Sequence, residues 1–130
     1  MRANGLITIR SLYEPTETMA RLRADVSARG MTEFAYIDHA AGAAEAGLPL
    51  RSTDLLIFGS PKGGTPLMQS VQAIGIDLPP KAPVWRDEAG ATWLSYNDPV
   101  WLVERHGGGS DVKAIVTTAA ALDAIATLAA

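Results

Sequence analysis

The 130-residue chain contains no cysteine. Disulfide bonds, thiolate zinc sites and a catalytic cysteine are therefore excluded. The 11 basic residues, set against 14 acidic ones, form no basic block, so a nucleic-acid interface is not expected. No apolar run approaches the roughly 18–20 residues that a membrane span requires. The composition therefore indicates a soluble protein that binds neither nucleic acid nor membrane.

The length of the chain favours one domain over residues 1–130. A chain of this size buries roughly two-thirds of its unfolded surface, which is enough for a hydrophobic core. Residues 1–5 carry one basic side chain and no apolar stretch before the first predicted strand. A cleaved signal peptide is therefore not expected, and the predicted location is the cytoplasm.

Apolar spacing and turn residues predict a mixed set of elements. In the first half, strands are predicted at 6–12, 34–38 and 55–59. Helices are predicted between them, from Pro15 to Gly30 and at 40–46. In the second half, a turn is predicted at 60–66, followed by a short helix from Leu67. A hairpin then pairs 84–86 with 92–96. Two helices are predicted after it, one from Asp98 to about 104 and the last from Ser110 or Asp111. We expect an α+β two-layer sandwich, with a mainly antiparallel sheet of about five strands and helices on one face.

The aromatic residues Trp85, Trp93, Tyr96 and Trp101 gather in and just after the predicted hairpin. Strand alternation puts Trp93 and Leu94 on opposite faces, so part of this aromatic surface lies outside the core. Such a patch is typical of a surface for self-association or for a partner. The alternative is that these side chains only build the core.

Asp38 and His39 stand where a predicted strand ends and a helix begins. His39 is a candidate metal ligand or proton shuttle, with Asp38 holding its tautomer. In the alternative, Asp38 caps the following helix and His39 bonds nearby backbone.

His39 and His106 supply the only imidazoles in the sequence. If they converge near Asp38, Asp98 or Glu104, they form a two-histidine-plus-carboxylate site for a divalent metal. Their spacing does not indicate whether they converge. His106 also has a structural reason to be there, because a helix C-terminus favours its cationic form.

Residues 58–65 join a strand to a helix through a glycine-rich segment, where backbone N–H groups can hold an anion. Ser60, Lys62 and Thr65 are its candidate ligands. The segment lacks the phosphate-loop pattern, because Lys62 precedes the glycines, and it lacks the spacing of a nucleophile elbow. The alternative is a tight turn.

Tyr96, Asn97 and Asp98 follow the predicted hairpin and precede a helix. Asn97 and Asp98 have structural roles available as turn former and helix cap. Tyr96 is expected to project its hydroxyl toward the other strand ends.

Several blocks of the sequence, in order, resemble one family. They are Tyr36-Ile37-Asp38-His39, Leu56-Ile57-Phe58-Gly59-Ser60-Pro61-Lys62, Gly64-Thr65-Pro66-Leu67-Met68, Ile76-Asp77-Leu78-Pro79, Val84-Trp85 and Tyr96-Asn97-Asp98-Pro99. Together they resemble the domain of unknown function 302 family of small bacterial and archaeal proteins, over nearly the whole chain. The resemblance implies a two-layer α+β fold similar to that of the TATA-binding protein, and a homodimer. It implies no catalytic residues, and Ser60 departs from the asparagine usual in that pattern.

The polar segments Asp38-His39, Ser60-Lys62 and Tyr96-Asp98 are all predicted at strand ends, where sites are commonly built. We therefore predict that they share one cleft, with His106 as a further wall. The cleft favours a small-ligand or metal-binding module. The alternatives are a homodimeric interaction protein, or an enzyme on a small anionic substrate in which His39 is the acid–base group and Lys62 holds the charge.

Overall fold

The computed structural model describes residues 3–108 and 112–130. Its elements are β1 (Leu6–Ser11), α1 (Pro15–Ala28), β2 (Thr32–Asp38), α2 (His39–Glu45), β3 (Thr53–Gly59), α3 (Pro61–Ser70), the 3-10 helix η1 (Gln72–Ile76), β4 (Lys81–Arg86), β5 (Thr92–Asn97), α4 (Pro99–Arg105) and α5 (Val112–Ala129). Apart from the short η1, this is the predicted order of elements. The predicted start of the last helix at Ser110 or Asp111 lies outside the described residues.

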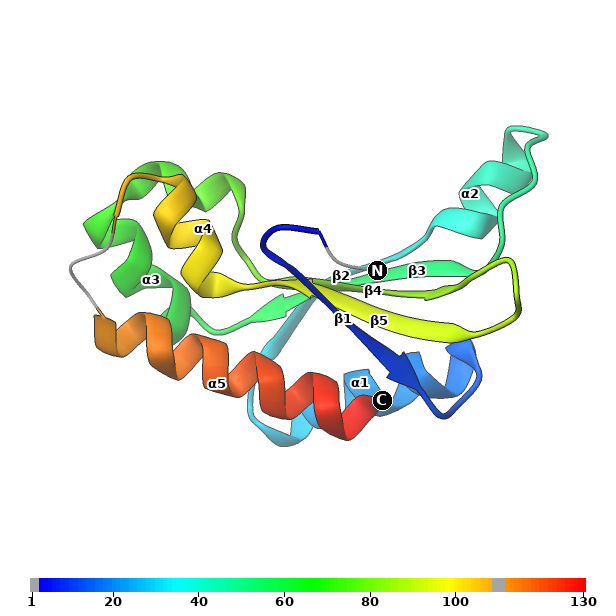
Figure 1. Cartoon of the computed structure of the whole chain (residues 1–130), viewed down its shortest axis with the longest axis horizontal. Coiled ribbons are helices and arrows are strands. Elements are labelled where there is room, and N and C mark those ends of the chain that lie inside the picture. Colours follow the sequence, from blue (N-terminus) through cyan, green and yellow to red (C-terminus); the bar gives the residue numbers. More distant parts are fainter. Residues whose placement is uncertain (1–2, 109–111) are drawn as a thin grey trace.

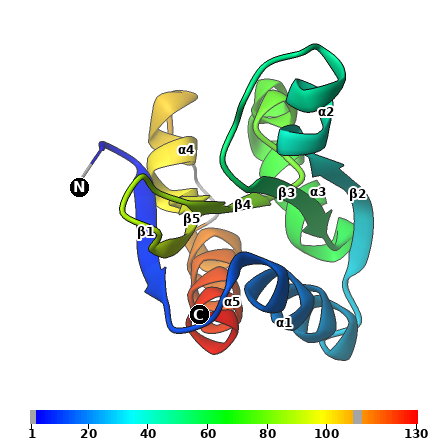
Figure 2. The ribbon, with the colours of Figure 1, turned by 90° about the vertical axis from the view of Figure 1, so that its right-hand side faces the viewer.

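The strands form one antiparallel sheet in the order β1-β5-β4-β3-β2. Helices α1 and α5 lie side by side across one face of this sheet (Figures 1 and 2). Helices α3 and α4 stand at one end of the sheet, and α2 stands at the other (Figure 1). The predicted α+β fold, with an antiparallel sheet of five strands, is confirmed.

The main core lies between the sheet and its two covering helices. Leu56, Val84 and Leu94 from the three middle strands are completely buried there, against Leu22 of α1 and Ile125 of α5. Removing that much apolar surface from water supplies most of the driving force for this layer. A second cluster joins α3, η1, α4 and α5 at one end of the sheet, through Leu67, Ile74, Leu102, Val103 and Ile115.

The opposite face of the sheet carries large side chains outside the core. Trp85 and Trp93 are cross-strand neighbours whose rings stack at a centroid distance of 6.1 Å. Ile37 lies opposite Leu55 across β2 and β3, and it is 39% exposed. Because Leu94 is fully buried and Trp93 is not, the predicted division of the hairpin into two faces is confirmed.

The predicted turn at 60–66 is wrong, because α3 already begins at Pro61. Ser60 caps this helix, since its hydroxyl accepts a hydrogen bond from the Lys62 N–H at 3.3 Å. Proline suits the first helical position, where its missing N–H costs nothing. Pro66 stands inside the helix and cannot donate a hydrogen bond to the Lys62 carbonyl, so α3 lacks one of its internal hydrogen bonds.

In the described part of the chain, no helix is both long enough and apolar enough to cross a membrane.

Candidate functional site

The antiparallel sheet separates the polar segments that were predicted to share a cleft. Strand β2 runs toward α2, whereas β3 and β5 run the other way, toward α3 and α4 (Figure 1). Asp38 and His39 therefore lie at one end of the sheet, and Ser60 and Asn97 lie at the other. The single cleft is not formed, because neighbouring antiparallel strands end at opposite edges.

Asp38 acts as the N-cap of α2, as the structural alternative proposed. Its carboxylate accepts a hydrogen bond from the Ala41 N–H at 2.9 Å, and His39 is the exposed first residue of the helix. Asp38 also borders a shallow polar recess with Tyr36 and Asp54. There the Tyr36 hydroxyl donates to Asp54 at 2.7 Å. This hydrogen bond, followed by burial, raises the pKa of Tyr36 to about 12.

The start of α3 does not offer free amides to an anion. The Lys62 N–H donates to the Ser60 hydroxyl, and the N–H groups of Gly63 and Gly64 donate to the Ser60 carbonyl at 2.9 and 3.1 Å. These donors are satisfied within the turn. The side chains of Lys62 and Thr65 remain exposed. Any anion bound near this segment must therefore be recognised chiefly by side chains.

Tyr96, Asn97 and Asp98, at the end of β5, lie in three different environments. Tyr96 is 4% exposed and belongs to the core, where burial raises the pKa of its phenol. Asp98 is the N-cap of α4, since its carboxylate accepts from the Val100 N–H at 3.0 Å. Asn97 lines a small cavity described below. Asp98 also borders an open recess beside the start of β1, together with Asn4 and Thr8.

The two histidines do not converge. His106 ends α4, where its Nε2 lies 2.6 Å from a carboxylate oxygen of Asp77. Arg105 donates to both oxygens of the same carboxylate at 2.9 Å. His39 is the first residue of α2, which stands at the other end of the sheet (Figure 1). Within residues 3–108 and 112–130, no group of three or more histidine or acidic side chains is arranged to hold a metal ion.

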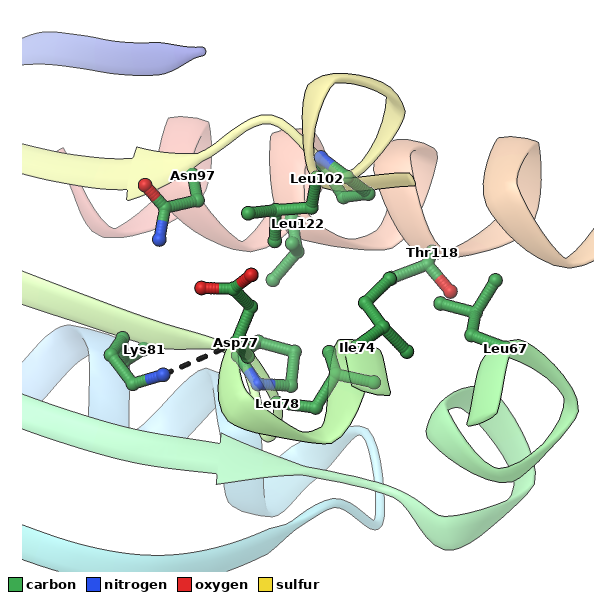
Figure 3. Close-up of a pocket in the computed structure, with 11 residues that line it drawn as sticks. Leu67, Ile74, Asp77, Leu78, Lys81, Asn97, Leu102, Thr118 and Leu122 are labelled. Atoms are coloured by element: carbon green, nitrogen blue, oxygen red, sulfur yellow. Dashed lines mark hydrogen bonds between the residues drawn. The ribbon is translucent and has the colours of Figure 1, made fainter. Parts of the chain in front are cut away.

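The small hollow that Asp77 and Asn97 enter will be called the Asp77 cavity (Figure 3). It is lined by Leu67, Ile74, Asp77, Leu78, Pro80, Lys81, Asn97, Pro99, Leu102, Thr118 and Leu122. The Lys81 ammonium donates to the backbone carbonyls of Asp77 and Pro79, at 3.4 and 3.2 Å. The volume of the cavity, about 20 Å³, is enough for one water molecule and too small for an organic ligand.

A larger hollow, which will be called the α5 pocket, adjoins the Asp77 cavity. It is lined by Arg29, Gly30 and Met31 after α1, by Phe58, Gly59, Ser60, Lys62 and Gly63 around the start of α3, by Pro80, and by Thr117, Thr118, Ala121 and Leu122 of α5. Pro80, Thr118 and Leu122 line both hollows and form the wall between them. The volume of the α5 pocket, about 310 Å³, falls within the range of small-molecule sites.

The α5 pocket has an apolar interior and basic groups among its lining. Phe58 and Leu122 are buried, and Met31 is half-buried. Arg29 and Lys62 are exposed. The Arg29 Nε donates to Asp25 at 3.1 Å. Among the described residues that line this pocket, none is acidic. Sequence reasoning had named Ser60 and Lys62 of this set.

Sequence reasoning missed the other polar residues of these hollows: Arg29, Asp77, Lys81, Thr117 and Thr118. Asp77 and its neighbours stood in one of the blocks that carried the family resemblance, which was a usable signal. Nothing in the sequence singled out Arg29, which follows α1, or Thr117 and Thr118, which lie on α5. Their position beside β3 follows from the packing of α1 and α5, which no local pattern specifies.

A solved structure has the same fold. The crystal structure of a DUF302 protein from Bacillus stearothermophilus superposes with a TM-score of 0.88 and covers 98% of this chain and 100% of its own. The sequences are 19% identical, so this likeness establishes the fold alone.

Curated relatives match in sequence over part of their length. Proteins named fluoride-specific ion channel FluC 1 from Brucella suis and Brucella abortus are each 49% identical over 118 residues. The match covers 88% of this chain but 46% and 44% of the two relatives, so the chain spans less than half of their length.

A family model supplies the assignment. The model described as domain of unknown function DUF302 matches residues 7–128, which include all of the sheet except Leu6 and all of α5 except Ala129. The blocks that carried the resemblance lie within that range. The chain therefore belongs to the DUF302 family.

Proposed function

We propose that this domain is a small-ligand-binding module and that its ligand occupies the α5 pocket. The observation that carries the proposal is the pocket itself, a hollow of about 310 Å³ with apolar side chains inside and polar groups around them. Small-molecule sites typically combine such an interior with a few convergent polar groups.

The construction of the α5 pocket also supports the proposal. Its residues come from the turn that follows α1, from β3 and α3, and from α5. Phe58 is 1% exposed on a strand with neighbours on both sides, so the inner surface is held by the core. A site built on packed elements keeps its shape without a ligand, which lowers the cost of binding.

The test uses a large side chain, introduced on α5, to fill the pocket. Ala121 lines the pocket, whereas its neighbour Ala120 is exposed and does not. We expect 1-octanol, a neutral apolar probe, to shift NMR signals of residues around the pocket in the wild type and in Ala120→Trp. Ala121→Trp should abolish these shifts while the protein stays folded. If the wild type binds neither 1-octanol nor a charged probe with the same octyl chain, or if the two variants bind 1-octanol equally, the proposed function is refuted.

A second candidate function, partner binding through the open face of the sheet, has its own support. This face carries the Trp85–Trp93 stack, together with Leu55 and Ile37, and neither α1 nor α5 covers it. Exposed apolar surface of this kind is typical of interaction sites, and a second copy of the chain is the partner we propose. Analytical ultracentrifugation should show a dimer for the wild type and a monomer for Ile37→Lys. A monomeric wild type at high protein concentration would contradict this candidate.

The Brucella relatives fit a module that works beside other sequence. In those proteins the similar segment makes up less than half of a chain named as a fluoride-specific ion channel. We infer that a DUF302 domain can operate within a longer chain, where ligand binding in one part can be linked to the state of another.

A further inference from the structure

We propose that the ligand of the α5 pocket is an amphipathic anion, meaning a carboxylate or a phosphate monoester on a short apolar chain. This inference rests on the proposed function, since it names the chemical class that the same pocket accepts. It goes further by assigning the charge of the ligand to Arg29 and Lys62, and the apolar chain to the interior that Met31, Phe58 and Leu122 provide.

The charge of the ligand follows from the lining. Arg29 and Lys62 both line the pocket, and no described residue that lines it is acidic. Arg29 has one ion-pair partner, Asp25, which lies outside the lining. Lys62 forms no ion pair with any residue that the structure describes. Two cations at one concave surface attract an anion and repel a cation, and a low-dielectric wall strengthens both effects.

The two cations come from separate elements. Arg29 is the C-cap of α1, and Lys62 belongs to the first turn of α3. Asp25 engages Arg29 only through the Nε atom, and in residues 3–108 and 112–130 no hydrogen bond holds its two terminal nitrogens. A guanidinium with free terminal N–H groups recognises a carboxylate or phosphate well. The ligand head is therefore expected between these two side chains.

An apolar chain on the ligand follows from the interior of the pocket. Met31, Pro80 and Ala121 are half-buried and leave apolar surface open to the pocket, next to the buried Phe58 and Leu122. An inorganic anion would leave this surface in contact with water and would gain nothing from it. An anion with an attached hydrocarbon chain covers it, and each buried methylene contributes about 0.8 kcal/mol.

The end of that chain meets the wall between the two hollows. Thr118 and Leu122 line both the α5 pocket and the Asp77 cavity, and Pro80 completes the wall. The cavity behind this wall holds only about 20 Å³. The wall therefore limits the length of the chain, and we expect medium-chain ligands to bind better than long-chain ones.

The experiment compares probes that share one chain and differ in the head: octanoate, octyl phosphate, 1-octanol and octylamine. Isothermal titration calorimetry on the full chain measures each affinity. We expect octanoate and octyl phosphate to bind about tenfold or more tightly than 1-octanol, as a charge-assisted contact predicts. Octylamine should bind more weakly than 1-octanol, because both pocket cations repel it.

Charge variants assign this preference to named groups. Lys62→Gln and Arg29→Gln should each remove most of the advantage of octanoate over 1-octanol and leave the affinity for 1-octanol unchanged. Lys113 is exposed on α5 and does not line the pocket, so Lys113→Gln is the matched control and should change nothing. An unchanged octanoate advantage in both pocket variants would overturn the assignment of the charge.

The outcomes separate this inference from the proposed function. If 1-octanol binds as tightly as octanoate, and Ala121→Trp abolishes the binding of both probes, the proposed function is supported and the preference for an anion is refuted. If none of the four probes binds the wild type, both proposals fail. Flotation with phosphatidylglycerol vesicles identifies the source of the ligand. Binding to vesicles that requires Lys62 supports a lipid headgroup, and octanoate binding without vesicle binding supports a free amphiphile.

Discussion

At the scale of single residues, Tyr36 has the most strongly shifted pKa described above, and its hydrogen bond to Asp54 is the largest cause. The Tyr36 hydroxyl donates to Asp54, and the guanidinium of Arg23 lies 4.7 Å from the centre of the tyrosine ring. The carboxylate stabilises the protonated phenol, while the cation opposes this effect. The net result is the raised pKa of Tyr36, about 12.

Asp54→Ala removes the main cause of this shift. We expect the pKa of Tyr36 to fall from about 12 toward its ordinary value of about 10, measured by NMR titration of the ring. Asp38→Asn removes a more distant charge and keeps the helix cap, so it should change this pKa only slightly. A pKa that stays near 12 in Asp54→Ala would contradict the hydrogen bond as its cause.

The pH dependence of stability follows from the same shift. A phenol whose pKa is raised in the folded state stabilises the fold fully below the unfolded pKa of about 10, and that contribution disappears as the pH rises toward about 12. Because Tyr36 is 38% exposed, solvent screens the pair and its contribution to stability is small.

At the scale of elements, three helices begin in the same way. Asp38, Ser60 and Asp98 each precede a helix and accept a hydrogen bond from a backbone N–H of its first turn. The first N–H groups of a helix have no partner within it, so a side-chain oxygen at this position stabilises the helix. Three of the predicted site residues are thus required by the fold itself.

Asp98→Ala tests this role at α4. We expect the variant to lower the free energy of unfolding by about 1 kcal/mol, measured by urea denaturation. Asp98→Asn retains a capping oxygen and should be nearly neutral, which separates capping from loss of charge. Equal destabilisation by the two variants would instead indicate a role for the carboxylate charge.

Local patterns predicted most of the elements and little of the site, and the reason is physical. Proline at the start of α1 and α4, and glycine after α1, mark helix ends through the conformation of the chain itself. The α5 pocket depends on Thr117 and Ala121 of α5 meeting Met31 and Phe58, far away in sequence. Such long-range contacts follow from the direction of each strand, which hydrophobic periodicity does not encode.

At the scale of the whole molecule, the sheet has one covered face and one open face. Adjacent residues of β3 show the difference, since Leu56 is 0% exposed beneath the helices and Leu55 lies half-buried on the other side. The energetic cost of removing a side chain should differ accordingly, because a cavity forms only where the surroundings are packed.

This pair of leucines provides a matched test. Leu56→Ala should lower the free energy of unfolding by about 2–5 kcal/mol in urea denaturation, as for other buried leucines. We expect Leu55→Ala to cost well under half as much in a monomer, because solvent already reaches that side chain. Similar costs for both variants would show that the open face is covered in solution, in favour of the partner-binding candidate.

Helix α2 buries none of its residues, and the segment after it exposes Leu48 and Leu50 at 63% and 49%. A unit that adds so little apolar burial can open while the core stays closed. In hydrogen–deuterium exchange, the amides of α2 should therefore lose their protons long before those of Leu22 or Leu94. We thus expect a slowly exchanging layer of sheet and helices beside an appendage that opens and closes on its own timescale.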